Sequence, residues 1–135
     1  MDTVPEGFEP LFRTSPFLDL AGPFYGKKSA DGLVVGLRVA EKHCNTRGSA
    51  HGGLLSTLAD VALGYNAAFG GDRPVAMVTA SLSIDFAGQA KLGDWLEARV
   101  DVQKVGRSLA FANAYLHVGD NRIARASAVF NVLPT

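Results

Sequence analysis

The sequence predicts one α+β domain in which an antiparallel β-sheet surrounds a single long helix. Its 135 residues suit one compact domain and are too few for two ordinary ones. One long stretch has helical character, and four stretches rich in Val, Ala, Phe, Ile and Tyr follow it, separated by short turns. Strands joined in series by short connections are antiparallel neighbours. The expected order is therefore strand, buried helix and four strands.

The N-terminal part is expected to hold little regular structure. Prolines punctuate residues 1–23, and we predict a loop over about residues 1–14 with at most a short helix around residues 6–12. The apolar and aromatic residues 15–25 are expected to pack against the domain. The first strand is predicted at residues 33–39, which are rich in Val and Leu.

One long helix is predicted over residues 53–69, after the turn formers of residues 43–50 and before a Gly-Gly-Asp stop. Apolar residues leave almost no solvated face on this helix, so it is expected to lie in the core. Four strands are expected after it, at residues 74–86, 94–104, 108–118 and 122–133.

Composition predicts a cytoplasmic protein that associates with another copy of itself. Thirteen Lys and Arg balance thirteen Asp and Glu, which argues against a nucleic-acid binder held by bulk charge. Apolar residues make up 47% of the chain and charged residues 19%, so part of the surface is expected to be buried against a partner chain. No signal peptide, no membrane span and no possible internal disulfide are visible, which favours the cytosol.

Asp60 is unexpected in the middle of an apolar helix. An unpaired charge in a core costs several kcal/mol, and folding alone would favour Leu or Ala there. Ser56 and Thr57 lie one turn earlier and form a narrow polar stripe with Asp60. Two interpretations stay open: a structural carboxylate, hydrogen-bonded to Ser56, Thr57 or a strand backbone, or a functional one.

The start of the helix favours the functional interpretation. The first turn of a helix offers amide N–H groups without intrahelical partners, and the glycines of His51-Gly52-Gly53 let a ligand approach those groups. Such a site can stabilise the oxyanion of a carbonyl under attack, and Asn45 adds a neutral donor. Gly52 and Asp60 are, however, about 12 Å apart along one helix. They can act on one carbonyl only if a second copy of the helix runs antiparallel alongside, as in a two-fold dimer.

These residues form a spaced pattern, Asn45-x2-Gly48-x2-His51-Gly52-Gly53-x6-Asp60, which Thr79 and then Ala90-Lys91-Leu92-Gly93-Asp94 follow. The pattern resembles the hotdog-fold acyl-CoA thioesterases, in particular the phenylacetic-acid-degradation and 4-hydroxybenzoyl-CoA types. The resemblance runs from about residue 15 to the C-terminus. It implies a curled antiparallel sheet around a central helix, a homodimer at minimum and a homotetramer as the expected assembly.

The resemblance also implies roles for individual residues. Asp60 would be the catalytic carboxylate, activating water or attacking the thioester. The Gly52 N–H and Asn45 would polarise the thioester carbonyl from the other subunit. Thr79 would help to position the water, and His51 would support the loop.

Further residues are expected to contact the substrate. The segment containing Gly106, Arg107 and Ser108 resembles the part of the family that lines the pantetheine and nucleotide of coenzyme A, with Arg107 on a phosphate. The remaining candidates for substrate contact are Gly53 and, as weaker phosphate ligands, Lys91 and Arg125. The sequence shows no dedicated aryl pocket. Five aromatic residues either belong to the core or could line such a pocket: Phe17, Phe24, Tyr25, Tyr65 and Phe69.

The expected reaction is hydrolysis of a small aromatic or a short- or medium-chain acyl-CoA to the free acid and CoA. No cofactor is expected, because CoA is part of the substrate, and the spacing of the three histidines predicts no metal site. Two alternatives stay open: a hotdog-fold hydratase or dehydratase that uses His51, and a non-catalytic acyl-CoA-binding module. A nucleophilic Cys44–His43 pair is disfavoured, because adjacent residues in an extended turn point apart.

Overall fold

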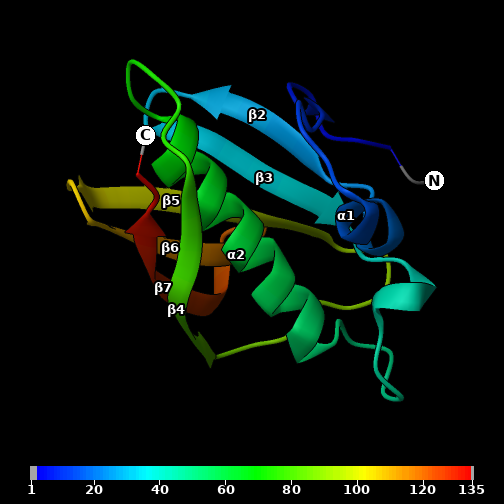
Figure 1. The fold of residues 1–135 in the computed structure, drawn as a ribbon. Coiled ribbons are helices and arrows are strands. Elements are labelled where there is room, and N and C mark those ends of the chain that lie inside the picture. Colours follow the sequence, from blue (N-terminus) through cyan, green and yellow to red (C-terminus); the bar gives the residue numbers. More distant parts are fainter. Residues whose placement is uncertain (1–2, 135) are drawn as a thin grey trace.

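The computed structural model describes residues 3–134, which form one seven-stranded antiparallel sheet curled around a long helix (Figure 1). The strands are β1 (Glu9–Pro10), β2 (Tyr25–Ser29), β3 (Gly32–Arg38), β4 (Met77–Phe86), β5 (Trp95–Val105), β6 (Leu109–Val118) and β7 (Asn121–Val132). The helices are α1 (Pro16–Ala21), a 3₁₀ turn (Glu41–His43) and α2 (Gly52–Phe69). The spatial order of the strands is β1-β2-β3-β5-β6-β7-β4. The predicted α+β class and hotdog arrangement are confirmed.

Helix α2 packs its apolar side against the concave face of the sheet. Its buried residues include Leu55, Leu58 and Leu63, and these meet fully buried side chains of the strands such as Leu96 and Leu116. Each such side chain contributes about 1.5–3 kcal/mol through its removal from water. In the described part of the chain, no helix combines the length and the hydropathy that a membrane crossing requires.

Asn66 fixes the C-terminal half of α2 to the start of β3. The side chain is only 5% exposed, and its Oδ1 accepts from Leu33 N at 2.9 Å. Its Nδ2 donates to the carbonyl oxygens of Leu33 and Ala62, both at 2.8 Å. Gly32 has a φ of +132°, and a Cβ there would lie 2.5 Å from Asn66 Oδ1, so the contact requires glycine.

Strand β4 is an edge strand with a β-bulge that changes the side to which one side chain points. It pairs with β7, and the register shifts between Thr79 and Ser81, so Ala80 is an extra residue of a β-bulge. Thr79 lies opposite Phe130 and Leu82 opposite Ala128, and both β7 residues face the core. The bulge therefore lets Thr79 share the helix-facing side of β4 with Leu82, although residues three positions apart in a regular strand face opposite sides.

The N-terminal region is more regular than predicted. The short helix allowed around residues 6–12 is absent, and β1 forms there instead. Helix α1 begins after Ser15, whose hydroxyl accepts from Leu18 N, and Pro16 occupies its first turn, where a missing N–H costs nothing. Strand β2 was not predicted, because Gly26 and two lysines give it little strand propensity and its pairing with β3 stabilises it instead.

Candidate active site

Asp60 and Thr79 form a hydrogen-bonded pair between α2 and β4. The Thr79 hydroxyl donates to Asp60 Oδ1 at 2.8 Å. Ser56 and Thr57 donate instead to the carbonyl oxygens of the first helical turn, at 2.9 and 2.8 Å. The interpretation of Asp60 as a structural partner of Ser56 or Thr57 is therefore wrong. No protein donor among residues 3–134 bonds Asp60 Oδ2, so this oxygen stays available to a ligand.

The face of α2 that carries Asp60 is open, contrary to the expectation that the helix is buried all round. Residues on this face are exposed or half-buried and small or polar: Gly53, Thr57, Asp60, Gly64 and Ala68. Glycine inside a helix costs about 1 kcal/mol relative to alanine. A Cβ at Gly64 would have the Phe130 ring as its nearest neighbour, at 3.6 Å, which is an ordinary contact. Packing within one chain therefore does not require glycine at this position.

Helix α2 begins with an amide that has no partner in the described chain. No acceptor among residues 3–134 takes the N–H of Gly52, the first helical residue. The N–H of Gly53 donates to His51 Nδ1 at 2.9 Å and is therefore not free for a substrate. Because Nδ1 accepts, Nε2 carries the proton of the neutral His51 ring. His51 thus caps the helix and leaves the Gly52 amide as the open donor.

The histidine that precedes this cap is part of the scaffold. His43 is 5% exposed; its Nδ1 accepts from Ala40 N at 2.9 Å and its Nε2 lies 2.5 Å from Ala21 O. Its carbonyl oxygen accepts from His51 N at 2.8 Å, which ties the cap to α1. Cys44 Sγ donates to Ala40 O at 3.4 Å. Cys44 and His43 thus bond to the backbone and not to each other, and the geometry offers no cysteine nucleophile.

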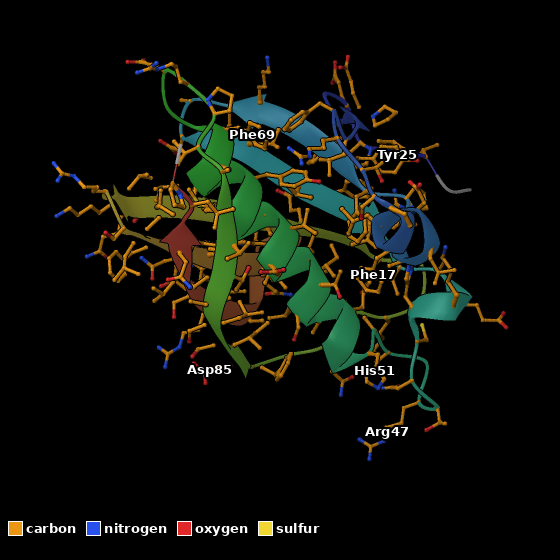
Figure 2. The ribbon with its side chains drawn as sticks, in the orientation of Figure 1. Phe17, Tyr25, Arg47, His51, Phe69 and Asp85 are labelled. Carbon is orange, nitrogen blue, oxygen red and sulfur yellow. The ribbon has the colours of Figure 1, made fainter. Side chains whose placement is uncertain are left out.

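Asn45 presents its amide nitrogen outward from the loop before α2. Its Oδ1 accepts from Arg47 N at 2.9 Å and Ser49 N at 3.2 Å, which stabilises the turn. In the described chain no acceptor takes its Nδ2. Figure 2 shows Arg47 and His51 at this end of α2 and Phe69 at the other end. The two candidate oxyanion donors, Asn45 and Gly52, therefore flank one end of the helix.

The predicted site residues of one chain form separate groups: Asp60 pairs with Thr79, whereas Gly52 lies at the start of α2. Eight residues of continuous helix separate Asp60 from Gly52, about 12 Å along the axis. Lys91 lies near Asn45, because it forms a β-bridge with Ser49. The β5–β6 turn, which holds Gly106, Arg107 and Ser108, lies at the opposite end, where Val105 lines a hollow with the glycines that end α2 (Figure 1).

Arg125 is engaged elsewhere. Its Nε donates to Asp85 Oδ2 at 2.9 Å, and both side chains are more than two-thirds exposed, at 73% and 71%. The hydrogen bond to Asp85 raises the pKa of the Arg125 guanidinium. The pair joins neighbouring positions of β7 and β4. This position removes Arg125 from the Asp60 side of the chain.

A groove of about 750 Å³ begins at Asp60 and Thr79 and follows the C-terminal half of α2. Of the five aromatic residues considered for an aryl pocket, three line it: Phe17, Tyr65 and Phe69. The other two do not, because Phe24 is buried in the core and Tyr25 packs against Trp95, with ring centroids 6.0 Å apart. The five-residue aryl pocket is therefore wrong as a set.

One side of the groove is the N-terminal segment around α1, of which the sequence indicated only Phe17 as a possible pocket residue. The Tyr65 hydroxyl donates to Arg13 O at 3.0 Å. The lining residues of this segment are Arg13, Thr14, Ser15, Phe17 and Leu18. Burial raises the pKa of Tyr65, and the Arg13 charge opposes part of that rise. The spacing of Gly64 and Ala68, four and eight residues after Asp60, is the signal in the sequence that could have indicated this open track.

The arrangement offers three chemical elements: an oriented carboxylate with one free oxygen, an unpaired amide at a helix N-terminus, and an apolar groove beside the carboxylate. A carboxylate can activate water or attack an acyl carbon, and a helix-terminal amide can stabilise the resulting oxyanion. Acyl transfer to water needs these parts within about 3 Å of one carbonyl, which one chain does not achieve.

Known proteins resemble the chain along most of its length. A family model described as "Thioesterase superfamily" matches residues 47–125. The chain is 57% identical over 133 residues to "Putative esterase PA0474" of Pseudomonas aeruginosa, covering 98% of this chain and 99% of that protein. It is 32% identical over 84 residues to acyl-coenzyme A thioesterase 13 of Mus musculus, covering 62% of this chain and 59% of that protein. The crystal structure of zebra fish thioesterase superfamily member 2 matches with a TM-score of 0.79 at 28% identity, covering 89% of this chain and 88% of that one.

Proposed function

Because the chain belongs to the thioesterase superfamily and is a thioester hydrolase, we propose that it hydrolyses an acyl-CoA to the free acid and coenzyme A. The observation that carries the proposal is the Thr79–Asp60 hydrogen bond of 2.8 Å at the mouth of an apolar groove. It leaves one oriented carboxylate oxygen beside a space suited to an acyl group. The name of the mouse relative supports a coenzyme A ester as the substrate.

The proposed active unit is a homodimer with antiparallel α2 helices. In that arrangement the N–H of Gly52 of the partner subunit lies beside Asp60, and the 12 Å separation within one chain is no obstacle. Two features support it. The open face of α2 between Gly53 and Asp60 is built of small and polar residues, which permits close approach of the partner helix there. Edge strand β4 exposes Val78 (49%) and Phe86 (53%), which a partner would cover.

In the proposed reaction Asp60 either takes a proton from water, which adds to the thioester carbonyl carbon, or adds to that carbon itself. In both modes the carbonyl oxygen gains negative charge, which the partner's Gly52 and the partner's Asn45 stabilise through N–H donors. The C–S bond then breaks and CoA leaves as its thiolate, which takes a proton. In the second mode water subsequently cleaves the acyl–Asp60 anhydride. Thr79 holds Oδ1 throughout and so directs Oδ2 toward the acyl carbon.

The antiparallel dimer also brings two candidate phosphate ligands, Arg107 and Lys91, close to each other across the two chains. The β5–β6 turn, which carries Arg107, lies near the C-terminal end of α2, and Lys91 lies near the N-terminal end of that helix. When two such helices run antiparallel, Arg107 of one chain approaches Lys91 of the partner subunit. We propose that these two charges bind CoA phosphates, with the backbone of Gly106 and Ser108 close to the pantetheine.

The first test is Asp60→Asn, which keeps the size of the side chain and removes its basic oxygen. Turnover of acyl-CoA should fall by about a thousandfold or more, because neither water activation nor acyl attack remains. Free thiol release is measured, with circular dichroism to verify the fold. Asp85→Asn is the matched control and should keep its activity, since Asp85 is an exposed residue that pairs with Arg125. An Asp60→Asn protein as active as the parent would refute the assignment.

A further inference from the structure

The groove next to Asp60 extends along the C-terminal half of α2 and is continuous with the proposed reaction centre. Its floor is a single helical track, because Asp60, Gly64 and Ala68 follow one another at intervals of four residues and all line it. Tyr65 and Phe69 flank that track on one side. The polar pair Asp60–Thr79 occupies only one end. A bound molecule that reacts at Asp60 would therefore extend its apolar part toward the C-terminus of α2.

The walls of the groove are largely apolar, with Arg13, Thr14 and Ser15 as polar residues on the N-terminal side. On the N-terminal side, the Tyr65 hydroxyl bonds Arg13 O at 3.0 Å, and Phe12 packs against Phe69 with ring centroids 5.1 Å apart. The guanidinium of Arg13 lies 5.7 Å from the centre of the Phe69 ring, at the far end. On the other side, residues 74–76, which precede β4, and Met77, its first residue, line the groove. These contacts thus hold Phe69 in position at the end of the groove that is remote from Asp60.

The length of the track sets the size of its occupant. Asp60 and Ala68 are eight helical residues apart, which corresponds to about 12 Å. An extended carbon chain advances about 1.25 Å per bond, given a C–C length of about 1.5 Å, so about ten carbons span the track. A single aromatic ring would fill only the part beside Asp60.

We propose that this groove binds the acyl group, and that the substrates are CoA esters of unbranched acyl chains of about eight to ten carbons. The proposal rests on the proposed function and names its substrate class. Gly64 and Ala68 are the specificity-determining residues, because the absence of larger side chains there leaves the track open. Gly64 in particular has no packing requirement within its own chain, since a Cβ there meets Phe130 at an ordinary 3.6 Å.

The first experiment measures kcat/KM for straight-chain CoA esters from acetyl to tetradecanoyl, with benzoyl-CoA for comparison. Each methylene buried in the groove should raise kcat/KM by about two- to fourfold, up to about ten carbons. Longer chains should bring no further gain, and benzoyl-CoA should fall below octanoyl-CoA. A flat profile, or a preference for benzoyl-CoA, would overturn the proposal and would fit a groove that the partner chain fills.

Two variants that block the groove at different points test which acyl-chain length it accepts. Ala68→Leu should leave hexanoyl-CoA within twofold of the parent and lower decanoyl-CoA about tenfold or more. Gly64→Leu lies about 6 Å from Asp60 and should shift the cut-off to about butanoyl. Loss of stability or of dimerisation would lower all esters alike, so the retained short-chain rate is an internal control. Ala30→Leu, in the exposed β2–β3 turn, is the matched surface control.

The outcomes separate this inference from the proposed function. Equal chain-length profiles for the parent, Ala68→Leu and Gly64→Leu would refute the groove as the acyl site while hydrolysis of acyl-CoA stands. A parent protein that hydrolyses none of the esters would refute the proposed function itself. Analytical ultracentrifugation and thermal unfolding of each variant verify that assembly and fold are retained.

Discussion

A mixed dimer of two inactive variants tests whether each active site takes residues from two chains. Asp60→Asn removes the carboxylate, and Gly52→Pro removes the amide donor. Proline is tolerated at the first helical position, and His51 has φ −63° and ψ 143°, which suits a residue before proline. The Gly52 N–H has no acceptor among residues 3–134, so this part of the fold loses no hydrogen bond. Gly52→Pro alone should lower kcat by about a hundredfold or more, the effect of losing one oxyanion donor.

The geometry of the proposed dimer determines the size of the recovery. In a heterodimer, one site combines both substitutions and the other combines the intact Asp60 of one chain with the intact Gly52 of its partner. Random mixing of equal amounts yields about one-half heterodimer, so about a quarter of all sites are intact. The mixture should therefore regain about a quarter of the parent activity, although neither variant is active alone.

The assay co-refolds or co-expresses the two chains with different affinity tags and follows thiol release from an acyl-CoA. Gly52→Ala is the control for the backbone change. It keeps the N–H, and its Cβ would approach the Phe86 ring at 3.4 Å, so it should lose far less activity than Gly52→Pro. If verified heterodimers show no recovery, the sites do not form across two chains and the reasoning is refuted.

Three further predictions follow from single contacts. Thr79→Val should lower kcat about five- to thirtyfold through the lost hydrogen bond to Asp60, and Thr79→Ser should restore most of it; equal impairment of both would contradict a role for the hydroxyl. Asn66→Leu should lower the free energy of unfolding by about 2–4 kcal/mol in urea denaturation, because Leu33 N–H and C=O lose their partners; a loss under about 1 kcal/mol would contradict this. Burial and two nearby arginines lower the pKa of His117 from 6.5, so its neutral form is favoured in the folded state. The free energy of unfolding should therefore fall as the pH drops below about 6.5, and His117→Gln should reduce that fall; an unchanged pH dependence would contradict it.

Much of the fold could be predicted because its signals are local. The helix of residues 52–69 and the strands β3 to β7 follow from periodicity and turn residues that neighbours in the chain supply. The same holds for the start of α2, where the glycines and the capping residue His51 are adjacent in sequence. Strand β2 could not be predicted in this way, because its pairing with β3 and not its own composition makes it a strand.

The candidate site needed the tertiary structure. The sequence marks Asp60 as anomalous, since a carboxylate among apolar residues is visible from composition alone. Its partner Thr79 is nineteen residues away and reaches it only because a bulge at Ala80 shifts the register of β4. The groove likewise depends on Arg13 bonding Tyr65 across 52 residues. Local patterns thus determined which segments are helix or strand, whereas contacts between distant segments decided which face of α2 stays open and what lines it, because such contacts form only when the chain is folded.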